Sequence, residues 1–287
     1  MRTVRPLRPL LPLVLVVAVT GCSGTQASEG ADGTTVLASS YPLQFVAAEV
    51  AGDRAQVSNL TPPGADSHGL ELTPQQIGGL GEADVVVHLS GLQPAVDEAL
   101  DLQAPEHVVD AAPLADLTGD PHFWLDPRRM ATLGHDVAAE LSEVDPEQAS
   151  EYEAAAERLE QTLTSLDAEY EQVLAPCRGA TLVTSHEAFG YLAERYGLEQ
   201  VGIAGIDPHV EPTPARVRDV VDVVQGRGVR TVFFEATTSP AVAQTFAEDL
   251  GAGTSVLHPV ERVEDGQDYL GLRHENLTAL EAGLTCG

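Results

Sequence analysis

The sequence lacks lysine altogether. Its fifteen basic residues are all arginine, they face 44 acidic residues, and the formal net charge at pH 7 is −29. This excess of negative charge excludes nucleic acid as a partner, because phosphate backbones need positive charge to bind. The acidity keeps the protein soluble and attracts cations only weakly at physiological ionic strength. Charge alone therefore predicts no binding site.

Catalytic motifs are also missing. The sequence has no Gly-x-Ser-x-Gly elbow, phosphate-binding loop or dinucleotide fingerprint. His186-Glu187 begins like a zinc-protease motif, but Gly190 stands where the second helical histidine is needed, and His274-Glu275 fails in the same way. We therefore expect a protein that is not an enzyme.

A long hydrophobic run is absent, and the N-terminus has a short one. Three arginines precede the apolar residues 10–19, which are fewer than the roughly 20 that cross a bilayer as a helix, so residues 1–21 read as a secretory signal. The run ends in Val19-Thr20-Gly21-Cys22, which resembles the lipobox of bacterial lipoproteins, whose cysteine is acylated. A free thiol at Cys22 is the alternative. With residues 22–33 as a flexible tether, we expect an extracytoplasmic protein anchored to the membrane by lipid and not spanning it, with a mature charge near −32.

Two cysteines remain after Cys22. An exported chain folds where disulfides persist, so we expect a bond between Cys177 and Cys286. It would close a loop of about a hundred residues and contribute on the order of 4 kcal/mol in the chain-entropy model. Two free thiols are the alternative.

Strand and helix patterns alternate along residues 34–144, which predicts a parallel sheet wrapped by helices. We expect an N-terminal α/β lobe with strands at 34–39, 56–60, 83–89 and 107–110 and helices at 42–51, 73–80, 93–100 and 128–141.

A long helix is expected over residues 145–176. Asp145-Pro146-Glu147 reads as its start, with a capping carboxylate and proline at the first helical position, and Pro176 ends it. Apolar residues recur every three or four positions, and the helix would be roughly 45 Å long, which suggests a rigid strut between two lobes. We expect a monomer, with a coiled-coil dimer through this helix as the alternative.

The alternation restarts in residues 177–287. It predicts a second α/β lobe with strands at 180–184, 200–203, 229–234 and 254–257 and helices at 187–196, 213–225, 240–250 and 275–284. The whole chain is thus predicted to be a two-lobed α/β protein joined by one long helix.

Of the nine histidines, those just after a predicted strand are the best candidate ligands, because ligands of open α/β sheets bind where the strands end. Histidines His68, His122, His186 and His258 pass this filter, two from each lobe. Four imidazoles in a cleft suit zinc better than calcium or magnesium, which prefer oxygen. His122 is also preorganised, since Pro121 stiffens its loop and the aromatic pair after it anchors the segment.

The acid Glu235 follows a strand in the same way. It is a fifth candidate ligand, or a partner that orients an imidazole, or a loop carboxylate in water. The remaining histidines read as structural or loop residues: His88, His107, His135, His209 and His274.

Several segments together resemble the metal-binding lipoproteins that serve bacterial ABC importers for zinc and manganese, specifically the zinc-uptake branch (cluster A-I). The resemblance covers nearly the whole mature chain. Its carriers are Pro62-Pro63-Gly64-Ala65-Asp66-Ser67-His68, then His122-Phe123-Trp124-Leu125-Asp126-Pro127, then Thr184-Ser185-His186-Glu187-Ala188-Phe189-Gly190-Tyr191, then Phe233-Phe234-Glu235, and a tail from Asp268 to Leu277.

The resemblance implies two α/β lobes that hold an ion between them and pass it to a membrane permease. It places ligands at His68, His122 and His186. The family's fourth ligand is commonly an aspartate in a Leu-Asp-Pro segment, where this chain has His258, so we expect that histidine to bind, with Glu235 or water as the alternative. The linker from Asp110 to Asp120 lacks the histidine-rich loop of some zinc members.

We therefore expect a lipid-anchored protein that captures Zn²⁺ outside the membrane and delivers it to an ABC importer. The alternatives are a Mn²⁺-specific protein of the same class, a zinc hydrolase with Glu235 as base, and a metal-dependent adhesin. On this interpretation His258→Ala weakens zinc binding clearly and Glu235→Ala weakens it little.

Overall fold

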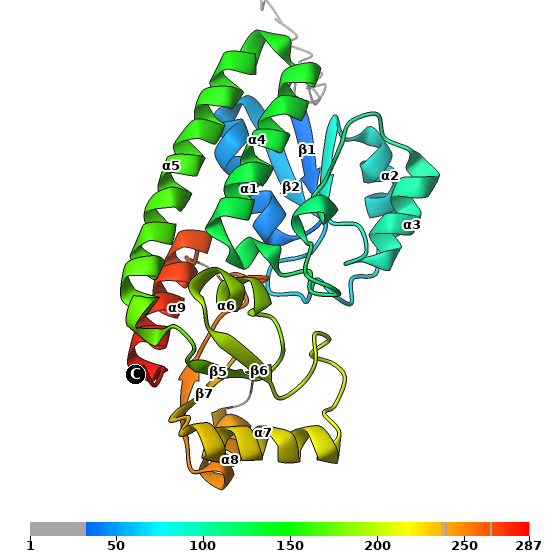
Figure 1. The fold of residues 1–287 in the computed structure, drawn as a ribbon. Coiled ribbons are helices and arrows are strands. Elements are labelled where there is room, and N and C mark those ends of the chain that lie inside the picture. Colours follow the sequence, from blue (N-terminus) through cyan, green and yellow to red (C-terminus); the bar gives the residue numbers. More distant parts are fainter. Residues whose placement is uncertain (1–32, 237, 239, 265, 287) are drawn as a thin grey trace, which may run out of the picture. The chain divides into compact units, whose positions relative to one another are not determined.

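The computed structural model describes residues 33–236, 238, 240–264 and 266–286 (Figure 1). The predicted signal peptide, most of the predicted tether and Cys22 lie outside these residues. In the described part of the chain, none of the helices combines the length and the apolar character required to cross a membrane.

Two four-stranded parallel sheets form the framework. The order of the first sheet is β2-β1-β3-β4 and that of the second is β6-β5-β7-β8. The strands are β1 (Thr34–Ala38), β2 (Ala55–Asn59), β3 (Val85–His88), β4 (Val108–Asp110), β5 (Thr181–Thr184), β6 (Glu199–Gly202), β7 (Thr231–Phe234) and β8 (Gly253–Val256). In each sheet the strand order reverses beside the first strand, which is where doubly wound folds bind ligands. The expected α/β class with two parallel sheets is confirmed.

Helices wrap both sheets. They are α1 (Tyr41–Ala51), α2 (Pro74–Glu82), α3 (Pro94–Gln103), α4 (Pro127–Val144), α5 (Ala149–Leu174), α6 (Gly190–Tyr196), α7 (Pro214–Arg227), α8 (Pro240–Leu250) and α9 (Tyr269–Gly283). Local chemistry sets several of the starts. Thr73 and Gln76 form a capping box before α2, and Asp126 accepts a hydrogen bond from the Arg128 N–H at the start of α4.

The long helix α5 packs along α4 and α1 and also contacts α9 (Figure 1). Its apolar stripe from Tyr152 to Leu174 is buried by these neighbours, so the seam proposed for a coiled coil is covered within the same chain. The buried Asp167 carboxylate of α5 accepts hydrogen bonds from Arg128 of α4 and from Arg195 of α6. These ion pairs fix α5 to helices beside both sheets.

Three sequence expectations need correction. Pro146–Gln148 form a separate 3₁₀ turn, and the Asp145 side chain makes no capping hydrogen bond. Helix α6 begins at Gly190 and not at residue 187, because the preceding residues form the loop that carries His186. Helix α9 begins at Tyr269, six residues early, because Asp268 caps it by accepting from the Gly271 N–H, so His274 is helical.

The Cys177–Cys286 disulfide is present, which confirms that prediction. It joins the turn after α5 to the residues after α9, across 109 positions of sequence. Around it, one large apolar cluster runs from β1 and α1 through α4 and α5 to α9. The elements that carry the candidate site therefore share a continuous core.

Candidate metal centre

His122 lies on a segment anchored in the core, as its sequence predicted. The next residues form a 3₁₀ turn, Phe123–Leu125, and the side chains of Phe123 and Trp124 are fully buried. The Trp124 indole N–H donates a hydrogen bond to the carbonyl oxygen of Pro259, at 2.8 Å. The turn therefore fixes His122 and also ties it to the chain after β8.

Both ring nitrogens of His122 face carboxylates. Its Nδ1 donates to Asp120 Oδ1 at 2.7 Å, and its Nε2 donates to Glu261 Oε1 at 2.8 Å. Burial lowers the pKa of His122, but hydrogen bonds and charge from Asp120 and Glu261 outweigh it and raise this pKa to about 9. His122 is thus an imidazolium held between two acids.

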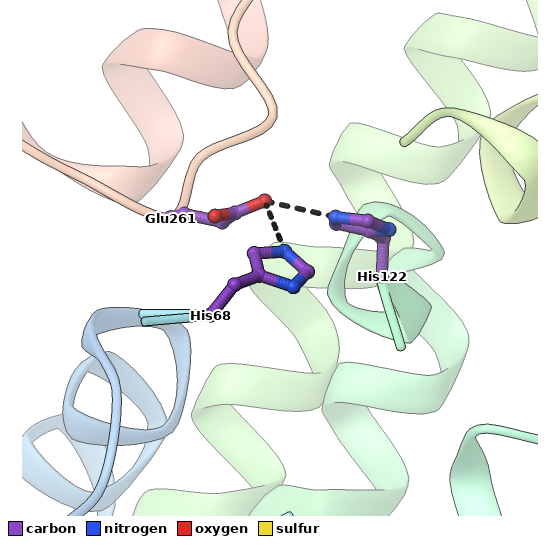
Figure 2. A group of neighbouring side chains, drawn as sticks. All are labelled: His68, His122 and Glu261. Carbon is purple, nitrogen blue, oxygen red and sulfur yellow. Dashed lines mark hydrogen bonds and ion pairs between the residues drawn. The ribbon is translucent and has the colours of Figure 1, made fainter. Parts of the chain in front are cut away.

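His68 approaches the same carboxylate from the loop after β2. Its Nε2 lies 3.5 Å from Glu261 Oε1, and its ring centroid lies 5.4 Å from that of His122 (Figure 2). The backbone N–H of His68 donates to Asp66 Oδ1 at 2.9 Å, which fixes the turn that carries the ring.

Glu261 is the member of the group that the sequence interpretation missed. It is 4% exposed, and its Oε2 accepts a hydrogen bond from Ser67 Oγ at 3.3 Å. Burial alone would raise the pKa of Glu261, but the contacts with His122 and His68 outweigh burial and hold this pKa far below its usual range. Ligand atoms of His68, His122 and Glu261 all lie within 4.8 Å of one another.

His186 completes the arrangement from the loop after β5. Its ring centroid is 5.6 Å from that of His122. Its Nδ1 donates to Glu235 Oε1 at 2.5 Å, so Glu235 orients this imidazole, one of the roles considered for it. Within the described residues, the buried Nε2 of His186 has no hydrogen-bond partner. This nitrogen is thus left unpaired beside the His122 ring.

The structure does not bring His258 to this group. Its Nε2 lies 3.4 Å from Glu275 Oε2, while its backbone N–H and C=O are bonded to the side chain of Asn276. Glu261, which lies three residues after His258 in the same loop after β8, contacts His68 and His122 instead. Glu261 also follows a strand, so position at a strand end admits both His258 and Glu261 and does not choose between them.

The other histidines pair with surface or half-buried acids outside the centre. His88 lies between Asp97 and Asp110, His107 bonds Glu140 beside Glu143, His135 bonds Glu160, His209 contacts Asp66, and His274 bonds Glu169. These contacts are consistent with the prediction that these five histidines are structural or loop residues.

The donor set determines which chemistry the centre can perform. Three imidazoles and one carboxylate make a compact, buried set of the kind that holds a borderline-soft divalent ion such as zinc. Glu235 accepts hydrogen bonds from His186 and from Ser185 Oγ at 3.0 Å, and the two bonds hold its pKa low although burial opposes them. It is therefore engaged in orienting His186 and poorly placed to act as a hydrolytic base.

A cavity of about 350 Å³ lies beside His186. His186 and Glu235 form its inner wall, and Asp66, His209 and Arg262 line it as well. The His209 side chain is 64% exposed, so the cavity connects the buried imidazole with the surface.

Comparisons with known proteins identify several similar chains. Zinc-binding lipoprotein AdcA of Streptococcus pneumoniae is 28% identical over 274 residues, which cover 86% of this chain and 55% of AdcA, so the chain spans about half of that relative. The high-affinity zinc uptake system protein ZnuA of Bacillus subtilis is 29% identical over 282 residues, which cover 88% of each chain.

A solved structure agrees with both. The laminin-binding protein Lmb of Streptococcus agalactiae, described as bifunctional with adhesin and metal transporting activity, superposes with a TM-score of 0.80 and 32% identity over 88% of this chain and 99% of that one. The family model for the periplasmic component A of the zinc-uptake complex matches residues 36–283. The chain therefore belongs to the ZnuA family, as its motifs predicted, and this is a family of solute-binding proteins and not of enzymes.

Proposed function

We propose that this protein captures Zn²⁺ outside the membrane with His68, His122, His186 and Glu261 and delivers it to an ABC-type importer. The observation that carries the proposal is the buried group itself. The Glu261 carboxylate lies within 3.5 Å of the rings of His68 and His122, and in the described part of the chain the buried Nε2 atoms of His68 and His186 have no hydrogen-bond partner. Such a nitrogen is costly to bury unless a ligand satisfies it.

Zinc is the cargo that these donors favour. Imidazole nitrogen suits zinc, whereas manganese is served better by carboxylate and carbonyl oxygen, and this group has three nitrogens to one carboxylate. The AdcA and ZnuA relatives are named for zinc, which supports the same choice. His258, proposed from sequence as the fourth ligand, is replaced in this proposal by Glu261.

Competitive titration of the purified chain with Zn²⁺ and Mn²⁺ tests the binding step. We expect tighter binding of zinc, and X-ray absorption of the loaded protein should show three nitrogens and one oxygen from protein. Glu261→Gln should keep the shape of the side chain and weaken zinc binding, while His258→Ala should not. A bound water in place of Glu261, or equal affinity in Glu261→Gln, would contradict the ligand set.

Lipid anchoring and delivery need separate tests. We propose that Cys22 carries the lipid and that residues 22–33 tether lobes 34–144 and 177–287, with 145–176 as the linking segment. Labelled palmitate should enter the full chain in a bacterial host and not its Cys22→Ser variant. Zinc uptake by cells that depend on this protein should then fall in Cys22→Ser, and more strongly in Glu261→Gln.

Adhesion is a second candidate, because the similar Lmb structure is described as having adhesin as well as metal transporting activity. Binding of immobilised laminin by the zinc-loaded chain tests it. Binding that survives Glu261→Gln would assign adhesion to a surface other than the metal centre.

A further inference from the structure

The segment His258–Arg262 contains a backbone conformation that its residues disfavour. Val260 has φ +61, and within the described residues only Ala104 shares a positive φ without being glycine. A β-branched side chain clashes with the backbone in this left-handed region, so the conformation persists only where surrounding contacts impose it. Val260 is 1% exposed, and the next residue is Glu261.

Hydrogen bonds hold the segment on both sides of Val260. On the N-terminal side the Asn276 side chain accepts from the His258 N–H and donates to the His258 C=O, each at 2.7 Å. The Trp124 indole N–H donates to the Pro259 C=O at 2.8 Å. On the C-terminal side Arg262 Nη2 donates to Asp66 Oδ2 at 3.0 Å.

These contacts come from the segments of the other proposed ligands. Trp124 lies two residues after His122, and Asp66 lies two residues before His68. Asn276 belongs to α9 and is fully buried, and its side chain bonds the backbone of His258 on both sides. Contacts from three segments thus hold the strained turn next to Glu261, whose carboxylate contacts the rings of His68 and His122.

We infer that Val260 and Asn276 are positioning residues for Glu261, and that Trp124 assists them by joining the Glu261 segment to the His122 segment. The inference rests on the proposed function, since it concerns how the fourth ligand is held. A carboxylate preorganised in this way loses little conformational freedom when the metal binds. Residues that never touch zinc therefore set how tightly it binds.

A double-mutant cycle tests whether Asn276 acts through Glu261. Zinc dissociation constants are measured by chelator competition for the full chain, Asn276→Ala, Glu261→Ala and the double variant. Outer partners of metal ligands typically contribute about 10–100-fold in affinity, and we expect about tenfold for Asn276→Ala in the wild-type background. In the Glu261→Ala background the loss should disappear.

Gln93→Ala is the matched control. Gln93 is a fully buried amide that donates to the Ser39 C=O and to Thr61 Oγ1 beside the first sheet, so its loss removes comparable hydrogen bonds elsewhere. We expect lower thermal stability and unchanged zinc affinity. An equal loss of affinity in Asn276→Ala and Gln93→Ala, or one that persists without Glu261, would overturn the inference.

Val260→Gly and Val260→Ala decide the question if Asn276→Ala does not fold. Both remove the buried isopropyl group, but only glycine relaxes the restriction on φ. Because φ +61 costs glycine little, the glycine variant should be more stable than the alanine variant and should bind zinc several-fold more tightly. Equal zinc affinity in the two variants would overturn the role of Val260. If Glu261→Ala itself binds zinc like wild type, the proposed ligand set fails and not merely the positioning.

Discussion

His122 and His186 are two buried imidazoles of one centre, and they differ at a single nitrogen. In both, Nδ1 donates to a carboxylate: Asp120 for His122, and Glu235 for His186. At Nε2 His122 donates to Glu261, whereas His186 has no partner among the described residues. One ring is charged and paired at both nitrogens, and the other keeps one unpaired nitrogen.

This difference between the two rings explains how the buried side chains can be stable without a bound metal. A buried cluster of imidazoles without charge compensation would be costly, but the His122 imidazolium neutralises Glu261 and is itself held by Asp120. His186 is one of the residues that line the cavity described above. If zinc binds as proposed, binding at His122 Nε2 requires that a proton leave.

The largest effects should come from removing either ring. His122→Ala and His186→Ala should each raise the zinc dissociation constant by more than about 100-fold, beyond the loss typical of an outer partner. His122→Ala leaves the buried carboxylate of Glu261 without its cation, so it should also destabilise the metal-free fold, by about 3–5 kcal/mol. Denaturant unfolding of the metal-free variant checks this, and wild-type stability would contradict the charged state of His122.

The orienting carboxylates should have the next largest effect. Asp120→Asn and Glu235→Gln each weaken an acceptor that fixes a proposed ligand, and each should weaken zinc binding about 10–100-fold. This expectation for Glu235 differs from the one drawn from sequence, which foresaw little loss. Calorimetric titration measures the zinc affinity of the two variants, and wild-type affinity in Glu235→Gln would show that His186 is held by packing alone.

The pH dependence should separate fold stability from zinc affinity. The pKa of His122 is raised from 6.5 to about 9, so its charged form stabilises the metal-free fold below pH 6.5, and this contribution is lost as pH rises through 9. Zinc needs the deprotonated Nε2, so affinity should rise over the same window, by about tenfold per pH unit.

Melting temperature and zinc competition, both recorded from pH 6 to pH 9.5, check these opposite trends. Asp120→Asn serves as the control, because losing this acceptor lowers the pKa of His122 and should move both profiles to lower pH. A zinc affinity that is flat across the window would indicate that His122 is neutral in the metal-free protein.

Much of this architecture was predictable because it depends on local patterns. Alternating strand and helix periods predicted both parallel sheets. Strand-end position selected His68, His122, His186 and His258, of which the structure brings the first three close together. Helix α6 was predicted too long because the residues after His186 have helical composition, although they form the site's loop. Helix α9 was predicted too short because its capping residue Asp268 precedes a tyrosine and glycine that conceal the start.

The fourth ligand that we propose, Glu261, was not predictable by position alone. His258 and Glu261 share one loop after β8, and sequence cannot tell which side chain points inward. That choice is made by long-range contacts: Asn276 bonds the backbone of residue 258, and Trp124 bonds the carbonyl of Pro259. The strained Val260 then turns Glu261 toward His122.

The smallest effect should come from His258→Ala, which should leave the zinc dissociation constant within about twofold of wild type. Alanine keeps the backbone N–H and C=O that Asn276 binds, so the Glu261 segment stays in place, and it removes only a ring that faces Glu275. Burial lowers the pKa of His258 although nearby acids raise it. A clear loss of affinity by chelator competition would mean that this ring, and not only its backbone, reaches the metal.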